Sequence, residues 1–505
     1  MVWLKRILIT LLILVVLIVG AAYIFLPKDF RQGLWFVLWK GDFSVFGEGQ
    51  TVTAQAAQRI KTAPGFAVNL YATGIDNARF MRFAPNGDLL ISQPRLGQIM
   101  ALRDTNDDGK ADDIKPLVQN LKQPHGLDFY QDWLYIGETH AIGRIQFDTA
   151  TGQTSGSYEQ VITGLPEGGN HWSKTIRFGA DEQLYVSIGS SCNVCEEADE
   201  RRATMMRYAP DGSAGKIYAT GLRNSVGFDW GPDGQLYATD NGRDLLGDNF
   251  PPCELNVVEE DEFYGWPYAN GANVVDPDLG AGHEEQIADA MPPTYDFRAH
   301  TAPLGMTFIR TASVPTEYKN AALVALHGSW NRSTKDGYEV ISLHWDETGK
   351  IRERVFLSGF EQDENVIGRP VDVVEGPDGA FYISDDYGKA IYRVAYTGNM
   401  DSTESGITLA TEAVVENPLA GVIEEVPAER LSRGQVLYEA HQCASCHEAE
   451  YAAEGVVVKP YKALAQRYTV DSMTAFLATP TPPMPVFPMD EEARRDVAVY
   501  LLKEK

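Results

Sequence analysis

The chain has few cysteines and few basic residues for its length, and each shortage excludes a class of protein. Only five cysteines occur in 505 residues, a small and odd number that excludes a dense disulfide scaffold. Lysine and arginine total 43 against 70 aspartates and glutamates, so the formal charge is −27. Because a chain this acidic repels phosphate backbones, we expect no nucleic-acid partner. Charged residues make up 22% and hydrophobic residues 44%, which is ordinary for a globular protein and excludes a disordered one.

The N-terminus contains a long uncharged run. Lys5 and Arg6 precede an apolar stretch over 7–26, and twenty helical residues span roughly 30 Å, the thickness of a bilayer core. Basic residues before the run and none within it predict a cytoplasmic N-terminus, with the bulk of the chain in the periplasm. A cleaved signal peptide with a small-residue site at 20–22 is the alternative. Because the apolar run continues past that site, the sequence favours a retained single-pass anchor of the inner membrane over 1–27, followed by a juxtamembrane segment over 28–60.

One phrase recurs between residues 61 and 396, a turn containing Asp or Asn followed by a short apolar strand. The copies lie at 85–92, 131–137, 180–187, 232–239 and 377–384, with a weaker one at 321–326. Asp-Gly turns before β-branched and aromatic runs are typical of hairpins. Repeats of roughly 40–50 residues, each too small to bury its own face, indicate propeller blades. The sequence therefore predicts an all-β six-bladed propeller, since the regular repeat argues against a β-sandwich. A long insertion over 241–300 is expected to help build a site.

The C-terminal residues predict a small all-α domain over 428–505, joined by a polar, acidic linker over 397–427. Between two helical patterns lies Cys443-Ala-Ser-Cys446-His447, the C-x-x-C-H pattern of haem c attachment. Two thiols at this spacing add to the two vinyl groups of haem, and His447 follows directly to bind the iron. A zinc site would need a second ligand pair nearby, which the sequence lacks.

The second axial ligand of such a haem is expected to be a downstream methionine, because Met/His ligation is common in cytochromes c. The candidates are Met473, Met484 and Met489, of which Met484 lies in a proline-stiffened loop over 481–488. The C-terminal stretch resembles the small class I cytochromes c, and Met484 matches that family's axial methionine. Met489 falls where the family has an apolar residue, so we expect it to pack in the core.

The propeller resembles the sugar dehydrogenases that use pyrroloquinoline quinone (PQQ), the soluble glucose dehydrogenase and sorbosone dehydrogenase group. The resemblance covers about residues 60–396, and it is most specific in the stretches 169–172, 190–196, 221–224, 254–256, 264–267 and 368–373. The stretches 190–196 and 327–332 resemble the sorbosone branch.

This resemblance implies a base and a pair of cofactor contacts. His171 matches the family's general base, and a neutral imidazole suits that role because its ordinary pKa lies near working pH. PQQ carries three carboxylates, so its pocket needs fixed cations, and arginine also stacks on planar rings. Arg223 and Asn224 match the family's cofactor-contacting pair.

Two further cofactor positions of the family lie in its last blades. Arg369 matches one of two arginines, whereas Val371 stands in place of the second. The family lysine of the preceding blade has no clear counterpart, and His327 and Arg332 are the candidates to replace it.

The resemblance also implies calcium, which in the family bridges PQQ to backbone carbonyls after a strand of the fourth blade and polarises the quinone. The matching place is 241–248, where Gly242 and Arg243 would offer carbonyls and Asp248 or Asp244 would lie nearby. An ordinary acidic turn is the alternative. Residues 104–109 also imitate the start of a calcium loop, but a lysine instead of glutamate stands at its twelfth position, which favours a solvated blade turn.

Cys192 and Cys195 form C-x-x-C without a following histidine, so they do not indicate a second haem. In an exported domain the two pair with each other, or one of them pairs with Cys253, and the sequence leaves both pairings open.

Together these features predict a membrane-anchored quinohaemoprotein dehydrogenase. A sugar, sugar aldehyde or polyol would give hydride to PQQ, and electrons would pass through haem c to a respiratory acceptor, a cytochrome or a terminal oxidase. Fusion of the two domains raises the effective concentration of the acceptor. Two alternatives stay open, a calcium-dependent lactonase-like propeller with a tethered cytochrome, and a non-enzymatic binding propeller with the same electron-transfer module.

Overall fold

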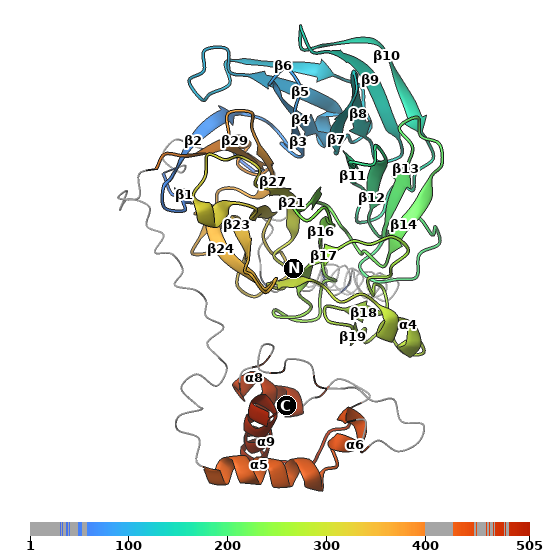
Figure 1. The fold of residues 1–505 in the computed structure, drawn as a ribbon, viewed down its shortest axis with the longest axis vertical. Helices are drawn as coiled ribbons and strands as arrows, with labels where there is room; N and C mark the ends of the chain where they lie inside the picture. The colour runs from blue at the N-terminus through green and yellow to red at the C-terminus, as the bar shows by residue number, and fades with distance from the viewer. Residues whose placement is uncertain are drawn as a thin grey trace, which may run out of the picture. The chain divides into compact units, whose positions relative to one another are not determined.

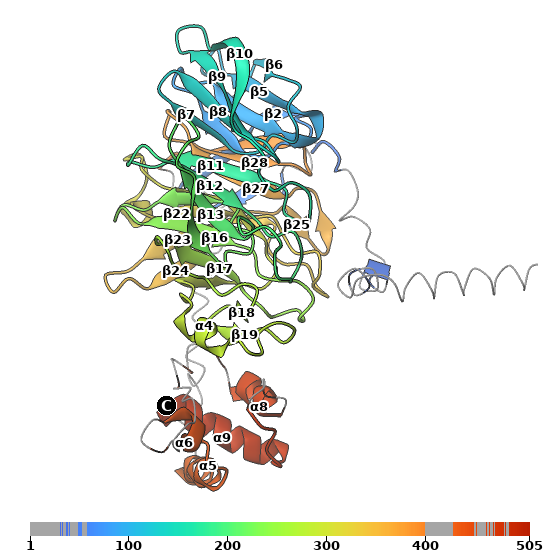
Figure 2. The same cartoon turned by 90° about the vertical axis from the view of Figure 1, so that its right-hand side faces the viewer.

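The computed structural model describes residues 31, 33, 37, 38, 40, 49–52, 58–398, 428–448, 451, 461, 464, 468, 470–478, 480 and 484–504. The chain divides into two compact units, Met1–Ile407 and Thr408–Lys505, which are described separately (Figures 1 and 2). The predicted membrane span over 7–26 lies outside the described residues. Within the described part of the chain, no helix is long and apolar enough to cross a membrane.

The first unit is a propeller of six antiparallel sheets, which confirms the predicted blade count (Figure 1). The first blade contains β3 (Met81–Phe83), β4 (Leu89–Gln93), β5 (Gln98–Arg103) and β6 (Asp113–Val118). The second contains β7 (Leu127–Tyr130), β8 (Trp133–Gly137), β9 (Ile142–Asp148) and β10 (Gln153–Ile162). The third contains β11 (Lys174–Phe178), β12 (Leu184–Ile188), β13 (Thr204–Tyr208) and β14 (Lys216–Thr220).

The remaining blades follow the same order. The fourth contains β15 (Phe228–Trp230), β16 (Leu236–Asp240), β17 (Cys253–Val257) and β20 (Tyr295–Phe297). The fifth contains β21 (Pro303–Phe308), β22 (Ala322–Leu326), β23 (Glu339–Trp345) and β24 (Ile351–Ser358), with β1 (Lys61–Thr62) added at its edge. The sixth contains β27 (Pro370–Glu375), β28 (Phe381–Asp385), β29 (Ala390–Tyr396) and the N-terminal strand β2 (Phe66–Thr73).

The ring is closed by the pairing of β2 with β29, in which Phe66 lies opposite Tyr396. An N-terminal strand therefore completes the last blade, so neither end of the repeat is left with an unpaired edge. Between the fourth blade's outer strands lie a small hairpin, β18 (Ala269–Asn270) with β19 (Val274–Val275), and the helix α4 (Glu284–Asp289). A second hairpin, β25 (Glu361–Gln362) with β26 (Asn365–Val366), precedes the sixth blade.

Hydrogen bonds and ring contacts explain why the turn-and-strand motif recurs from blade to blade. In three blades the tyrosine of the second strand donates its hydroxyl to the turn aspartate four residues earlier. These bonds are Tyr185 to Asp181 at 3.1 Å, Tyr237 to Asp233 at 2.9 Å and Tyr382 to Asp378 at 3.1 Å. The tyrosine rings also pack between neighbouring blades, for example in the edge-to-face contact of Tyr185 with Trp230 at 5.3 Å. One side chain thus fixes both the hairpin turn and the blade interface.

The apolar core lies between the blades. Each of the six interfaces has its own cluster of buried hydrophobic side chains, drawn from the facing sides of two sheets. Because the second strand of each sheet is covered on both faces, it is buried at nearly every position, whereas outer strands such as β10 are largely exposed. Strands β4, β12 and β16, for example, are buried throughout. The polar residues of the connecting loops are therefore left to the two ends of the propeller.

The second unit is helical. It contains α5 (Ala428–Ala440), α6 (Ala444–His447), α8 (Val470–Ala478) and α9 (Glu491–Glu504). Its core includes Tyr438, Met473, Met489 and Val497, so the predicted packing role of Met489 is consistent with its burial. Nε of Arg433 on α5 donates to Oδ2 of Asp496 on α9 at 2.8 Å, which ties the two longest described helices together.

Candidate functional site

All the residues predicted to line a propeller site emerge at one end of it. In an antiparallel blade, the loop that enters the innermost strand and the loop that joins the second and third strands lie at the same end. The first kind of loop carries His171, Arg223, Asn224 and Arg369, and the second kind carries Gly242, Arg243, Asp248, His327 and Arg332. We call this end the site face.

His171 precedes β11 and is held by one residue. Its Nδ1 lies 2.8 Å from Oγ and 3.0 Å from the backbone oxygen of Ser190. The Ser190 hydroxyl donates its single hydrogen to the backbone oxygen of Cys192 at 2.7 Å, so toward His171 it is an acceptor. Nδ1 therefore carries the hydrogen. Nε2, which makes no hydrogen bond with the described residues, keeps its lone pair.

The environment of His171 favours a neutral ring. Burial and the positive charge of Arg223 lower its pKa well below 6.5. The close fit depends on Gly189, since a Cβ there would lie 2.5 Å from Cβ of His171 and 2.6 Å from Oδ1 of Asn224. A neutral imidazole with an exposed lone pair has the properties of a general base.

Arg223 is buried and its guanidinium bridges two loops. Nε donates to the backbone oxygen of Asn193 at 2.9 Å, and one terminal nitrogen donates to Oδ1 of the same residue at 2.9 Å. The other terminal nitrogen donates to the backbone oxygen of Asn241 at 3.0 Å. Asn224 donates its backbone N–H to Oδ1 of Asp240 at 2.5 Å. The structure thus brings together the predicted pair Arg223 and Asn224, with Arg223 engaged by protein acceptors.

A second cluster on the site face joins blades one, five and six. Nε2 of His327 lies 2.9 Å from Oδ1 of Asp386, whose Oδ2 accepts a hydrogen bond from Arg79 at 2.8 Å. Arg369 donates to the backbone oxygens of His327 and Gly328, both at 3.0 Å. The sequence prediction named His327 and Arg369 but missed Arg79 and Asp386. Asp386 directly follows a repeated strand, the position that carries site residues in other blades, and this was the signal available for it.

Several nitrogens of the site face are without a partner among the described residues. Nε of Arg79 and Nε2 of His125 are buried and make no hydrogen bond. His125 is stacked on Phe80 at 4.2 Å and contacts Trp172 edge-to-face at 5.6 Å. Native proteins leave few buried polar atoms unpaired, so these nitrogens indicate a place for a ligand with acceptor groups. Such a ligand would lie over aromatic surface.

The predicted calcium residues have other partners for their side chains. Arg243 is buried and binds both oxygens of Asp276, at 2.8 and 2.6 Å, and one oxygen of Asp278 at 3.0 Å. Asp248 accepts from the backbone N–H of Ser333 at 3.0 Å, and Arg332 donates to the Asp248 backbone oxygen. These side chains therefore fasten the insertion to the fourth and fifth blades.

A pair of buried carboxylates lies beside these residues. Asp240 and Glu254 lie opposite each other on β16 and β17. Burial raises the pKa of both, and the charge of Asp240 adds to the effect on Glu254. They line a cavity of about 20 Å³ together with Asn241, whose buried Oδ1 has no partner among the described residues. Carboxylate and amide oxygens are the ligands that calcium prefers.

The turn over 104–109 has no free carboxylate at its first position. Oδ2 of Asp104 accepts from the N–H of Gly109 at 2.7 Å, and Oδ1 accepts from that of Asp108 at 3.1 Å. These bonds fix the shape of the turn, and a solvated blade turn stays the prediction for 104–109.

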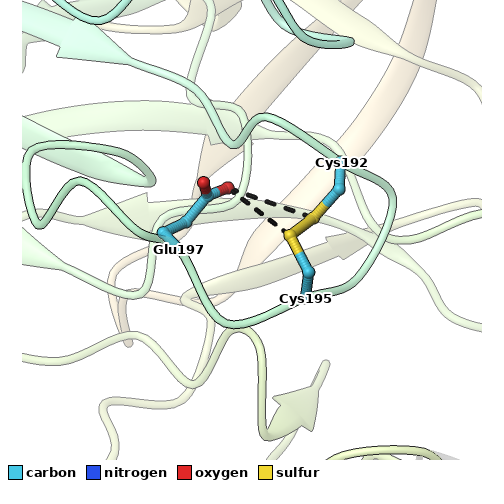
Figure 3. Close-up of side chains that lie close together, drawn as sticks. All are labelled: Cys192, Cys195 and Glu197. Carbon is cyan, nitrogen blue, oxygen red and sulfur yellow. Dashed lines mark hydrogen bonds between the residues drawn. A yellow bond between two sulfur atoms is a disulfide. The ribbon is translucent and has the colours of Figure 1, made fainter.

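The cysteine pairing left open by the sequence is resolved. Cys192 and Cys195 form a disulfide (Figure 3), and Cys253 is buried and free. An oxygen of Glu197 lies 4.0 and 3.9 Å from the two sulfurs. Within the described residues, these three form the only close group of histidine, cysteine, aspartate or glutamate with at least three members. A set of carboxylates converging on a metal, which a lactonase would need, is absent from that part of the chain.

The C-x-x-C-H motif lies at α6. Cys443 is half-buried, Cys446 is exposed, and neither is in a disulfide, as attachment of haem through both thiols requires. The ring of His447 stacks on Tyr461 with centroids 4.5 Å apart. Met484 is half-buried and packs against the core of the helical unit.

Comparison with known proteins places the propeller in a family. The TrAA12-like family profile matches residues 60–262 and 249–397. A protein of Borreliella burgdorferi is 32% identical over 354 residues, covering 67% of this chain and 91% of that relative. The PQQ-dependent pyranose dehydrogenase of Coprinopsis cinerea is 24% identical over 404 residues, covering 66% of this chain and 54% of that enzyme. This chain therefore spans about half the length of the Coprinopsis enzyme.

Solved structures share the fold. The PQQ domain of the Coprinopsis cinerea pyranose dehydrogenase superposes with a TM-score of 0.57 at 21% identity, covering 66% of this chain and 97% of that domain. The calcium structure of the Trichoderma reesei AA12 protein superposes with a TM-score of 0.59 at 20% identity, covering 67% of this chain and 97% of that protein. These similarities establish the fold, and the predicted resemblance to the PQQ-dependent sugar dehydrogenases is confirmed for the propeller. Because the family profile spans more than half of the residues, the chain belongs to the TrAA12-like family.

Proposed function

We propose that the propeller oxidises a sugar, sugar aldehyde or polyol with PQQ, and that haem c in the C-terminal unit accepts the electrons. The observation that carries the proposal is the state of His171, a neutral ring whose Nδ1–H is held by Ser190 and whose Nε2 keeps its lone pair. Removal of a hydride from an alcohol carbon requires loss of the hydroxyl proton, which a base in this state accepts. PQQ, when bound, supplies the hydride acceptor.

The other steps of the proposed reaction are assigned to side chains and backbone groups of the site face. Nε2 of His171 takes the hydroxyl proton, and the backbone oxygen of Ser190 stabilises the charge that develops on the ring. Arg79 and Arg369 supply positive charge suited to the carboxylates of PQQ, and a buried nitrogen of Arg79 is without a partner among the described residues. The relatives named for PQQ support this cofactor.

Calcium is proposed at the carboxylate pair of Asp240 and Glu254, where a divalent ion would neutralise two buried charges. Asn241 lies beside this pair and also accepts a hydrogen bond from Arg223. A cation there would therefore stabilise the loop that holds Arg223. The calcium structure of the Trichoderma AA12 protein is in keeping with calcium in this fold.

The electron path is proposed from the C-terminal motif. Cys443 and Cys446 would attach haem c, with His447 and Met484 as axial ligands of the iron. The uncharged run over 7–26 would anchor the protein in the inner membrane, with both units in the periplasm. A respiratory cytochrome or terminal oxidase would then receive the electrons.

The test is substrate-dependent reduction of the haem. The full-length protein is loaded with PQQ and calcium, a panel of sugars, sugar aldehydes and polyols is added, and the visible spectrum is followed. We expect the haem to become reduced with at least one substrate class. In the matched His171→Gln variant, the rate should fall roughly 10²–10⁴-fold while PQQ still binds. An unchanged spectrum with every substrate would overturn the proposal, and failure to bind PQQ would point to a non-enzymatic propeller.

A further inference from the structure

The connection between β12 and β13 contains a short disulfide loop on the site face (Figure 3). Cys192 and Cys195 are separated by three positions, and both are half-exposed, whereas Asn193 between them is 5% exposed. The loop therefore directs one polar side chain into the protein and leaves its sulfurs within reach of solvent. Its contacts lead to the proposed base and to the proposed cofactor arginine.

One contact path leads to the base. The backbone oxygen of Cys192 accepts the hydroxyl hydrogen of Ser190 at 2.7 Å. This bond leaves the Ser190 hydroxyl oxygen as a second acceptor for Nδ1–H of His171, beside the Ser190 backbone oxygen, and both acceptors favour the tautomer with a lone pair on Nε2. If the Cys192 backbone moved, the Ser190 hydroxyl would be free to turn away from its present orientation, and Nδ1–H of His171 would lose one of its two acceptors.

The other contact path leads to the arginine. Asn193 accepts two of the hydrogen bonds of Arg223, through its backbone oxygen and its Oδ1, both at 2.9 Å. Its Oδ1 also accepts from the backbone N–H of Asp244 at 2.7 Å, and its Nδ2 donates to the Asp244 backbone oxygen at 3.2 Å. Asn193 thus joins the disulfide loop to Arg223 and to the insertion that follows β16.

The shape of the loop depends on the disulfide and on hydrogen bonds, among them one from the N–H of Asn170 to the backbone oxygen of Ser191 at 2.9 Å. Its residues belong to no helix or strand. Glu197 holds the start of the loop through the N–H and hydroxyl of Ser191, at 2.6 and 2.7 Å. Crosslinking the loop removes conformations in which Asn193 leaves its buried position.

We propose that the Cys192–Cys195 disulfide is a positioning element that holds His171 and Arg223 in their working states together, so that its reduction weakens both. This inference rests on the proposed function. Reduction by a dithiol converts the disulfide into two thiols while the dithiol becomes a disulfide, so two electrons and two hydrogens are transferred.

The two paths allow the proposal to be tested with separate variants of the full-length protein. Ser190→Ala breaks the path to His171, and we expect kcat to fall about tenfold, the order of one lost hydrogen bond to a charged group. The affinity for PQQ, measured without turnover by quenching of tryptophan fluorescence, should stay the same. Asn193→Ala breaks the path to Arg223, and we expect the reverse pattern, with PQQ affinity about tenfold weaker and kcat unchanged at saturating PQQ.

The double variant Cys192→Ser/Cys195→Ser should show both losses and should not respond to dithiothreitol. The wild-type protein should acquire both losses when reduced and recover when reoxidised. Cys253→Ser, which removes the buried free thiol, is the matched control and should respond to reduction like the wild type.

Two outcomes would overturn the inference while leaving the proposed function intact. One is a double variant that binds PQQ and turns over as the wild type does. The other is a double variant that loses both properties while Ser190→Ala and Asn193→Ala lose neither. If the wild-type protein itself fails to reduce its haem with any substrate, the proposed function fails instead.

Discussion

Nε2 of His327 lies 2.9 Å from Oδ1 of Asp386, and this bond joins the fifth blade to the sixth. Burial, followed by the charge of Arg369, lowers the pKa of His327 to about 4, against the opposing effect of Asp386. At neutral pH the bond therefore joins a neutral imidazole, which donates, to an ionised carboxylate. Although burial alone would raise the pKa of Asp386, the neighbouring His327, Arg79 and Arg369 lower it below its ordinary value.

This arrangement predicts the pH dependence of stability. The folded pKa of His327 lies below its ordinary 6.5, so the unfolded chain binds more protons between about pH 6.5 and 4, and stability falls as the pH falls through that window. His327→Gln should flatten this slope in urea unfolding measured from pH 7.5 to 4. An unchanged slope would mean that His327 is not neutral and buried in the folded protein.

Asp386→Asn should lower the free energy of unfolding at pH 7 by about 1–3 kcal/mol, because Arg79 loses its charged partner in a largely buried place. The lowered pKa of Asp386 means that its contribution is present above its ordinary pKa and is lost as the pH falls below that value. The exposed Asp363→Asn is the matched control. If both variants unfold at the same urea concentration, the ion pair of Arg79 with Asp386 contributes nothing measurable to the free energy of unfolding.

The pH dependence of catalysis should follow the protonation state of His171. Protonation of Nε2 removes the base, so the rate falls on the acid side of its pKa. Because burial and Arg223 lower that pKa, kcat/KM should hold constant down through pH 6.5 and decline only below it. An acid limb at or above pH 6.5 would contradict the environment described for this ring.

The blades were predictable from the sequence because their signals are local. A turn aspartate and a tyrosine four residues later specify one hairpin, and the pattern repeats. The cluster of Arg79 with Asp386 was not predictable in this way. The two residues are 307 positions apart and meet only because β2 and β29 close the ring.

The side-chain contacts of the insertion were also not predictable from the sequence. The side chains of Arg243 and Asp248, in the region where the family pattern predicted calcium, bind Asp276 and Ser333, and the backbone carbonyls of Gly242 and Arg243 as calcium ligands stay a prediction. The sequence singled out 254–256 for its resemblance to the family, but it did not pair Glu254 with Asp240. Their proximity depends on the register of β16 against β17. The individual contacts of the insertion thus depended on the fold and could not be predicted from the position of the motif.

Calcium should stabilise the propeller through Asp240 and Glu254. Since burial raises the pKa of both carboxylates, protons compete with the ion at low pH, and the rise in Tm on adding calcium should be larger at pH 8 than at pH 6. The double variant Asp240→Asn/Glu254→Gln should lose this rise. Asp104→Asn, in the acidic turn of the first blade, should keep it. A calcium response that survives in the double variant would place the ion elsewhere.

Met484 is the proposed axial ligand of the haem iron. Met484 is the half-buried methionine of the helical unit, whereas Met473 and Met489 are buried in its core. In Met484→Ala the haem should stay attached through Cys443 and Cys446, but its reduction potential should fall, because a thioether ligand raises the potential of haem iron. Potentiometric titration of the visible spectrum measures this shift. Met489→Leu is the matched control, since a volume-conserving core change costs less than about 1.5 kcal/mol and should leave the potential unchanged. A shift in Met489→Leu without one in Met484→Ala would assign the ligand to the other residue.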